Sequence, residues 1–279
     1  MSEKKPRVVV LMTTFNRCDN TKNCILSLTE KNPELDMRFV VTDDKSQDGT
    51  EDMLFQLGEN IKIHLIKGNG SLFWTGGMYK SLEYALAHSK EFEYALLVND
   101  DVEFYDSAIE NLKSRLEKSD AKIIVGATED ADGEMSYGGV KKLSRFFAKF
   151  GLVEPSEEIT YCDTFNCNCV LMSSETFGKL GNLDNKYIHS MGDFDYGLMA
   201  TKKGFKIISS DSFVGRCSDN DVSKSWRNPK LPRCERLKLK ESPKGLPRKD
   251  WFHFVNKNYG FISALYHTAT PYIRILIGK

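Results

Sequence analysis

Two clusters of acidic residues follow short apolar segments and a third stands at the start of a predicted helix, and carboxylates in such places can bind a nucleobase, hold a cation or accept a proton. The clusters are Asp43-Asp44, Asp100-Asp101, and Asp193 with Asp195. In a parallel sheet, ligands bind beyond the carboxyl ends of the strands, so residues that follow strands are the first candidates for a site. The clusters therefore predict an acidic site at one edge of a sheet.

The first cluster, after the second apolar run, is paired with the segment TTFNR (13–17), which stands at the end of the first apolar run. A carboxylate such as that of Asp44 can accept the N3–H of uracil or thymine, while Thr13 contacts the base or the ribose. Asn16 and Arg17 complete this predicted nucleotide site. The alternative is an Asp-rich turn at Asp48-Gly49 followed by a capped helix.

The second cluster, Asn99-Asp100-Asp101, follows the very apolar segment YALLV. Adjacent carboxylates at the mouth of a buried strand repel each other and are desolvated, and a divalent cation would offset both effects. Mg²⁺ and Mn²⁺ suit such hard oxygen ligands, keep several waters and bridge to diphosphate oxygens, so few protein carboxylates are needed. A solvated acidic loop is the alternative.

The third cluster, Asp193 and Asp195, stands at the start of a predicted helix that ends at Gly204. Acidic residues at a helix start often serve only as caps and favourable partners of the helix dipole. The other interpretation is a catalytic carboxylate. Because two residues rotate a helix by about 200°, only one of the pair can face a bound ligand.

The segment GNGSLFWTGGM (68–78) precedes another predicted helix. Gly76 and Gly77 would let the backbone approach a phosphate or a sugar closely, and helix N-termini favour anions. Trp74 either stacks on a sugar face or fills the core. These three residues form a predicted sugar contact, whereas His189, four residues before Asp193, is interpreted as structural.

Apolar, β-branched runs alternate with helix-periodic segments, which predicts an α/β fold with a Rossmann-like, mostly parallel sheet flanked by helices. The predicted strands are 8–14, 39–44, 61–66, 94–100, 122–128, 167–174 and 206–210. The predicted helices are Asn20–Glu30, Thr75–His88 and Asp106–Lys118, with Asp106 as N-cap. Residues 129–160 lack a clear period and predict a long surface loop or a small hairpin.

The 279 residues carry no net charge, but the charges are unevenly distributed. Residues 216–279 hold 14 Lys/Arg against 5 Asp/Glu, a net charge of +9, which leaves −9 for residues 1–215. This asymmetry predicts an α/β domain at 1–215 and a basic, aromatic, helical C-terminal extension at 216–279. No nucleic-acid partner is expected.

Seven cysteines, an odd number without framework spacing, favour free thiols in a reducing compartment, so a cytoplasmic location is expected. Cys167 and Cys169 fall on one face of a predicted strand, but the second half of a zinc site is missing. No segment has the roughly 18 apolar residues that would span a bilayer.

Six motifs, taken in order over residues 6–215, resemble the inverting glycosyltransferases of family 2, which adopt the GT-A fold. They read VVVLMTTFNR, VVTDDKSQDGT, GNGSLFWTGGM, LLVNDD, CNCVLMSSETFGKLG and MGDFDYGLMATKKGFK. The resemblance implies that Thr13 and Asp44 hold the nucleobase. It also implies that Asp101 ligates Mn²⁺ or Mg²⁺, that Asp100 supports it, and that Asp193 is the catalytic base.

Two features depart from the family pattern. The metal motif is Asn-Asp-Asp instead of a spaced DxD, and Phe213-Val214-Gly215-Arg216 stands where many relatives carry a histidine. The second ligand on the metal side is therefore not identified by the resemblance.

The resemblance implies transfer of a sugar, with inversion, from a UDP- or dTDP-activated donor to a hydroxyl of a glycan or lipid-linked acceptor in bacterial surface polysaccharide synthesis. A nucleotidyltransferase and a non-catalytic sugar- or nucleotide-binding module are the alternatives. The extension predicts contact with the inner membrane face, and packing on the α/β domain or in a homodimer is the alternative. Its interfacial aromatics would be Trp251, Phe252, Phe254, Tyr259, Phe261 and Tyr266.

Overall fold

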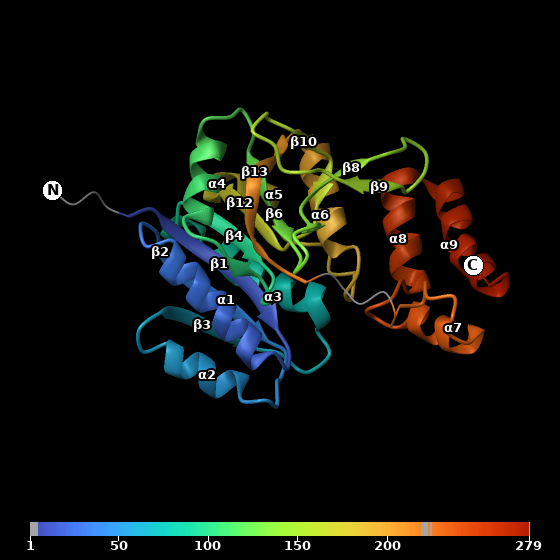
Figure 1. Ribbon diagram of the computed structural model, residues 1–279, viewed down its shortest axis with the longest axis horizontal. Coiled ribbons are helices and arrows are strands. Elements are labelled where there is room, and N and C mark those ends of the chain that lie inside the picture. The colour runs from blue at the N-terminus through green and yellow to red at the C-terminus, as the bar shows by residue number, and fades with distance from the viewer. Residues whose placement is uncertain (1–4, 219–222, 224, 279) are drawn as a thin grey trace.

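The structure is a computed structural model that describes residues 5–218, 223 and 225–278 (Figure 1). Residues 1–4, 219–222, 224 and 279 lie outside the described part, and they include the first residues of the predicted domain and short pieces of the predicted extension.

A mixed sheet forms the centre of the molecule, with its main strands in the order β10-β13-β6-β12-β4-β1-β2-β3. Strands β1 to β4 pair in parallel, whereas β12 runs antiparallel to both of its neighbours, β4 and β6. All seven predicted strands are present. Their bounds are β1 Arg7–Thr14, β2 Asp36–Asp43, β3 Lys62–Lys67, β4 Tyr94–Val98, β6 Ile123–Glu129, β12 Cys169–Ser173 and β13 Ile207–Arg216.

Three short strands complete this sheet. They are β5 (Glu103–Phe104) and β10 (Tyr161–Cys162), which pair with β13, and β7 (Met135–Tyr137), which pairs with β6. The predicted strand at 167–174 is shorter than expected, so Cys169 begins β12 and Cys167 precedes it. All seven cysteines are free thiols.

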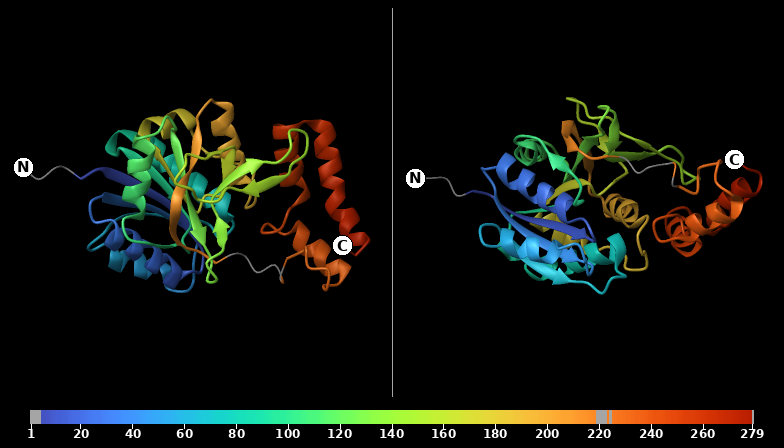
Figure 2. Two further views of the ribbon diagram at one scale, coloured as in Figure 1. Left: turned by 45° about the horizontal axis from the view of Figure 1, so that its top comes forward. Right: turned by 60° about the horizontal axis from the view of Figure 1, so that its bottom comes forward.

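Helices cover both faces of the sheet (Figures 1 and 2). Because side chains alternate along a strand, Val8 and Val10 of β1 join one buried cluster and Val9 and Leu11 join the other. The first cluster packs against α1 (Cys18–Lys31), α2 (Thr50–Leu57) and α4 (Ala108–Glu117). The second packs against α3 (Phe73–Ala87), α5 (Ser174–Leu180) and α6 (Gly192–Lys202), with the 3-10 turn η1 (Ser89–Glu91) after α3.

The predicted N-cap of α4 is wrong by one residue. Ser107, in the left-handed region at φ 55°, precedes the helix, which begins at Ala108. The carboxylate of Asp106 instead pairs with Lys31 Nζ at 2.7 Å, at the end of α1. Asp106 therefore links two helices and does not cap one.

Residues 129–160 confirm the hairpin interpretation. Strands β8 (Gly139–Lys142) and β9 (Phe150–Leu152) pair antiparallel, and β11 (Thr164–Phe165) extends them to a three-stranded sheet. In Figures 1 and 2 this hairpin projects from the main sheet towards the C-terminal helices.

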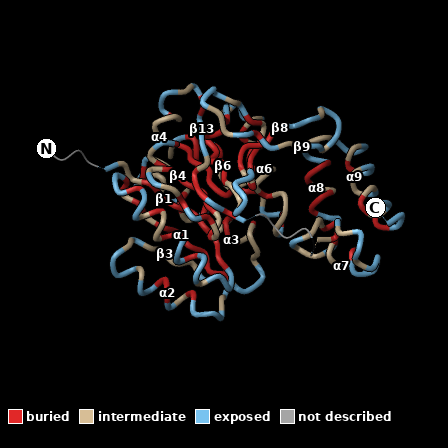
Figure 3. The backbone as a smooth tube through the Cα atoms, viewed as in Figure 1, coloured by how far each residue is buried: buried red, intermediate tan, exposed pale blue. Residues whose placement is uncertain are grey.

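The C-terminal extension is helical, with α7 (Arg233–Glu241), α8 (Arg248–Tyr259) and α9 (Phe261–Leu276). Trp251, Phe254 and Val255 of α8 are buried in a third apolar cluster with Tyr187 and Leu198, and Leu198 belongs to α6 (Figure 3). The extension is thus docked on the α/β part through α8. Among the described residues, no helix combines the length and apolarity needed to cross a bilayer.

Candidate functional site

A cavity of about 410 Å³ opens at the carboxyl ends of β1 and β4, and all three acidic clusters contribute to its wall. Its size is that of a small-molecule site. It is lined by Thr13, Thr14, Phe15, Arg17, Asp44, Gly70, Phe73, Trp74, Asn99, Asp100, Asp101, Tyr137, Asn166, Asn168, His189, Ser190, Met191, Asp193, Phe194 and Lys244.

Asp44 is almost fully buried and is held by the start of α3. Its Oδ1 accepts a hydrogen bond from Gly70 N at 2.7 Å, and its Oδ2 accepts from Leu72 N at 2.8 Å and Phe73 N at 3.1 Å. A carboxylate has about four lone-pair positions, so these donors leave about one for a ligand. Asp44 therefore anchors α3 as well as facing the cavity, a role that sequence reasoning missed.

The loops that follow β1 and β2 are tied to each other by Asn16, which is not part of the cavity wall. Asn16 Oδ1 accepts from Gln47 N at 2.7 Å, and Asn16 N donates to Ser46 Oγ at 2.8 Å. Asp48 Oδ1 accepts from Thr50 N at 3.2 Å at the start of α2, with Gly49 at φ 88°. The capped turn therefore coexists with the cavity, because Asp48 forms the turn and Asp44 lines the site.

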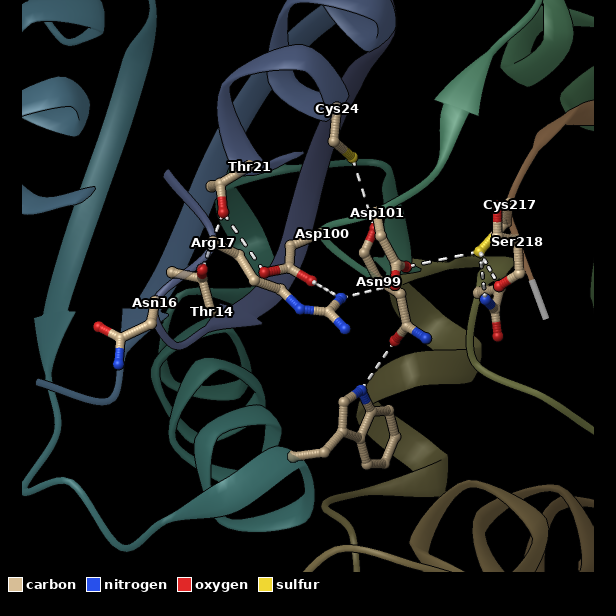
Figure 4. A network of polar contacts seen from close by, with 12 residues as sticks. Thr14, Asn16, Arg17, Thr21, Cys24, Asn99, Asp100, Asp101, Cys217 and Ser218 are labelled. Atoms are coloured by element: carbon tan, nitrogen blue, oxygen red, sulfur yellow. Dashed lines mark hydrogen bonds and ion pairs between the residues drawn. The ribbon is translucent and has the colours of Figure 1, made fainter. Parts of the chain in front are cut away.

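Arg17 lies between the two carboxylates that follow β4 (Figure 4). Its Nη1 is 3.1 Å from Asp100 Oδ1 and 2.5 Å from Asp101 Oδ2. Thr21 Oγ1 also donates to Asp100 Oδ2 at 3.3 Å. Burial raises the pKa of Asp100 to about 6, although the charge of Arg17 acts to lower it. The acidic pair is thus compensated by a cation, as its burial requires.

The same pair fits a divalent cation. Asp101 is the more accessible carboxylate, with 26% of its side chain exposed against 7% for Asp100. Within the described residues, no group of three or more His, Cys, Asp or Glu gathers around a common metal position. Mg²⁺ and Mn²⁺ need only one or two carboxylates when substrate phosphates and water supply the other ligands. Arg17 and such an ion would compete for Asp101.

Cys217 stands where the chain leaves β13, directly after the segment Phe213-Val214-Gly215-Arg216. Its Sγ is 3.5 Å from Asp101 Oδ1, and Asn168 Nδ2 is 3.4 Å from the same sulfur (Figure 4). Burial raises the pKa of this thiol well above its ordinary range. A neutral thiol is a poor ligand for a hard cation, so Cys217 supports Asp101 through a hydrogen bond.

Trp74 has both of the predicted environments, since it packs against the second apolar cluster and also lines the cavity. Its Nε1 donates to Asn99 Oδ1 at 2.8 Å, and its backbone N donates to His189 Nδ1 at 3.4 Å. Burial lowers the pKa of His189 to about 4, so the ring is neutral at pH 7 and can accept this bond. His189 therefore positions α3, and it also lines the cavity.

Gly76 and Gly77 are not brought to the cavity wall. They lie in the first turns of α3, and a Cβ atom on Gly77 would come within 2.0 Å of Thr13 Oγ1. The glycine thus allows α3 to pack closely on the end of β1. The glycine of this segment that lines the cavity is Gly70, at φ 88°.

The two carboxylates of the third cluster face different surroundings. Asp193 lines the cavity, where its Oδ1 accepts from Phe194 N at 2.8 Å, and burial raises its pKa to about 6. Asp195 points to α8, with its Oδ2 at 2.6 Å from Lys257 Nζ and its Oδ1 at 3.1 Å from Asn258 Nδ2. Only Asp193 is thus available to a ligand in the cavity.

Lys244, between α7 and α8, brings a cation from the extension into the cavity wall. The loop that carries it is fixed, because Ser190 Oγ donates to Gly245 O at 2.9 Å and a Cβ on Gly245 would lie 2.0 Å from Leu239 O. Sequence reasoning missed this residue, since nothing in its neighbourhood distinguishes it from the other lysines of the extension.

Solved structures similar to this one have the GT-A fold of glycosyltransferases. The mannosyltransferase PcManGT from Pyrobaculum calidifontis, in complex with GDP-Man and Mn²⁺, has a TM-score of 0.57 at 14% identity, over 99% of this chain and 74% of that chain. S. aureus TarS 1-349 has a TM-score of 0.58 at 13% identity, over 97% of this chain and 80% of that chain. Its complex with UDP-GlcNAc gives 0.56 at 13% identity, over 97% of this chain and 79% of that chain.

The family model described as glycosyl transferase family 2 matches residues 9–172, more than half of the chain. The chain therefore belongs to glycosyl transferase family 2. This membership favours glycosyl transfer over the nucleotidyltransferase alternative. No curated protein sequence matches the chain.

Proposed function

We propose that this protein transfers a sugar, with inversion, from a UDP- or dTDP-sugar to a hydroxyl of a glycan or lipid-linked acceptor. The observation that supports this most is the single cavity that joins Asp44, the Asp100-Asp101 pair and Asp193. In such a reaction Asp44 could bind the nucleobase, the Asp100-Asp101 pair could hold a cation at the diphosphate, and Asp193 could take the proton of the acceptor hydroxyl.

The nucleoside would lie at the ends of β1 and β2. Asp44 has one acceptor position left after its three backbone contacts, which suits the single N3–H of uracil or thymine. Thr13 lies on the adjacent strand and lines the same wall. The donor sugar would contact Trp74 and the backbone at Gly70.

The transfer itself would use Asp193 as a general base. As the acceptor oxygen bonds to the anomeric carbon, its proton moves to the Asp193 carboxylate. The bond from that carbon to the diphosphate oxygen breaks on the opposite face, and the nucleoside diphosphate leaves with the bonding electrons. A pKa of about 6 allows Asp193 to be ionised at pH 7 and still take up a proton during reaction.

The leaving diphosphate gains negative charge, and cationic side chains in the cavity would stabilise it. Arg17 and Lys244 both line the wall, and they come from the N-terminal part of the chain and from the C-terminal extension. When bound at Asp101 with support from Asp100, Mn²⁺ or Mg²⁺ would supply further charge neutralisation of the diphosphate. Arg17 would then remain as a second cation close to the diphosphate oxygens.

The acceptor is proposed from the family resemblance and the extension. The resemblance implies a role in surface polysaccharide synthesis with a lipid-linked acceptor, and free thiols and a basic extension suit a protein that works at the cytoplasmic face of a membrane. The proposed location is therefore the cytoplasm, with the acceptor at the membrane surface.

The test is a screen of UDP-, dTDP- and GDP-sugars with Mn²⁺ or Mg²⁺, in which released nucleoside diphosphate is measured. We expect release from a UDP- or dTDP-sugar, and NMR of the glycosylated acceptor should show the anomeric configuration opposite to that of the donor. Donor binding by thermal shift without release from any donor, with or without acceptors, would instead identify a non-catalytic binding module. Retention of configuration would reject the role of Asp193.

A further inference from the structure

Helix α9 is apolar on two sides, but the protein covers only one of them. Ala264, Pro271 and Ile275 form a buried stripe that packs inward. On the outer side, Phe261 is 60% and Ile262 is 83% exposed, and exposed Leu265 and Tyr266 follow one turn later. Adjacent exposed apolar side chains of this kind mark an interaction surface, and nothing among the described residues covers the outer side.

The tip of the β8–β9 hairpin extends this surface. Phe146 is 71% exposed, and its carbonyl accepts from Ser263 Oγ of α9 at 3.0 Å. The ring of Phe147 lies 5.7 Å from that of Tyr266. We call the surface formed by Phe146, Phe147, Phe261, Ile262, Leu265 and Tyr266 the outer face. It combines segments more than a hundred residues apart in sequence, which lie side by side in Figures 1 and 2.

The two segments that form the outer face carry positive charge. The hairpin, residues 139–152, contains Lys141, Lys142, Arg145 and Lys149 and no acidic residue, and the only charged residue of α9 is Arg274. All five side chains are exposed, and within the described residues none forms a salt bridge with a carboxylate. An apolar surface with uncompensated lysine and arginine around it has the composition of proteins that lie on anionic membranes.

A second copy of the chain fits this surface less well. In a two-fold dimer the same surface meets itself, so the hairpin cations would face the hairpin cations of the other copy without acidic residues between them. An anionic bilayer instead offers headgroups for the cations and acyl chains for the aromatic side chains.

We propose that the outer face docks on an anionic lipid bilayer. Phe150 of the same hairpin lies 5.1 Å, ring to ring, from Phe194, which lines the cavity. Docking would therefore hold the cavity beside the membrane surface. Trp251 and Phe254, which the sequence placed among the interfacial aromatics, are instead buried against the α/β part.

The test is cosedimentation of the full chain with vesicles of phosphatidylcholine alone or mixed with phosphatidylglycerol, without any donor. We expect binding only to the anionic vesicles, with an affinity that falls as salt is added. Phe146→Ser and Ile262→Ser should each weaken binding about tenfold, since each removes most of one buried apolar side chain. Arg145→Glu should weaken it at least about fivefold.

Phe55→Ser is the matched control, because Phe55 is also 60% exposed but belongs to α2, outside the outer face. This control variant should bind vesicles as the original chain does. All of the variants should have the melting temperature of the original chain. The proposal is wrong if the original chain ignores anionic vesicles at low salt or binds neutral ones equally. It is also wrong if Phe55→Ser loses as much binding as Ile262→Ser, or if sedimentation shows a dimer that Ile262→Ser dissociates. Because no donor is used, these results do not depend on the proposed transferase activity.

Discussion

Replacing Asp193 by Asn tests the proposed general base with the least change in shape. The amide can still accept from Phe194 N, the bond that the carboxylate makes at 2.8 Å, but it cannot take up a proton. We expect turnover to fall by about 10²–10⁴-fold, the usual contribution of a general base. Donor affinity should be almost unchanged, because other residues contact the nucleobase and the diphosphate of the donor.

The pH dependence gives a second, independent signature. Since burial raises the pKa of Asp193 to about 6, kcat/KM of the original chain should rise as the pH passes through about 6 and the carboxylate ionises. This rise should be absent from the residual activity of Asp193→Asn. The profile is measured in buffers of constant ionic strength with saturating metal.

The same pKa shift predicts that Asp193→Asn stabilises the fold at neutral pH. The ordinary pKa is 3.8 and the folded value is about 6, so the folded state binds more protons and loses stability as the pH rises through this interval. A shift of about two units corresponds to at most about 3 kcal/mol. Asp193→Asn should therefore unfold at higher denaturant concentration at pH 8, with little difference at pH 3.5.

Asp195→Asn is the control for position. It removes the ion pair with Lys257 and should lower stability, but it should leave turnover within a few-fold of the original because its side chain faces α8. Near-normal transfer by Asp193→Asn, together with loss of turnover in folded Asp195→Asn, would refute the assignment of the base.

Three further substitutions separate the remaining roles. Asp44→Ala should weaken UDP or dTDP binding with or without Mn²⁺, and should also lower the free energy of unfolding by about 1 kcal/mol because three N–H groups at the start of α3 lose their acceptor. Asp101→Ala should weaken donor binding chiefly when Mn²⁺ is present, as calorimetry with and without the ion would show; equal losses in both conditions would contradict the metal role. Gly77→Ala should destabilise the fold by about 1–3 kcal/mol in denaturant titrations, because its Cβ would overlap Thr13; an unchanged midpoint would mean that α3 can shift.

Local patterns predicted the strands well because buried parallel strands are continuous apolar runs. The segments around Val9, Val40 and Leu97 are β-branched or aliphatic and end in polar residues, so both the strands and the site at their ends were visible in the sequence. The reversed direction of β12 was not visible, because a buried strand has the same composition in either direction.

Other parts of the site depend on tertiary contacts that spacing does not encode. The spacing of Asp193 and Asp195 required that they diverge, but only the docking of α8 shows which one is neutralised by Lys257. The extra role of Asp44 depends on where the start of α3 lies in space. Lys244 reaches the cavity from a loop between two helices. The periodicity of apolar residues does not predict where the side chains of such a loop point.

The position of Lys244 also bears on how the protein becomes active during synthesis. The central sheet has all its strands once Arg216 has been made, yet one wall of the cavity is contributed by a loop more than twenty residues later. That loop is held by Ser190, and the helix after it is buried against α6 through Phe254. A nascent chain can thus complete its sheet on the ribosome while its cavity is still open on one side, and the cavity closes only after α8 has emerged and docked.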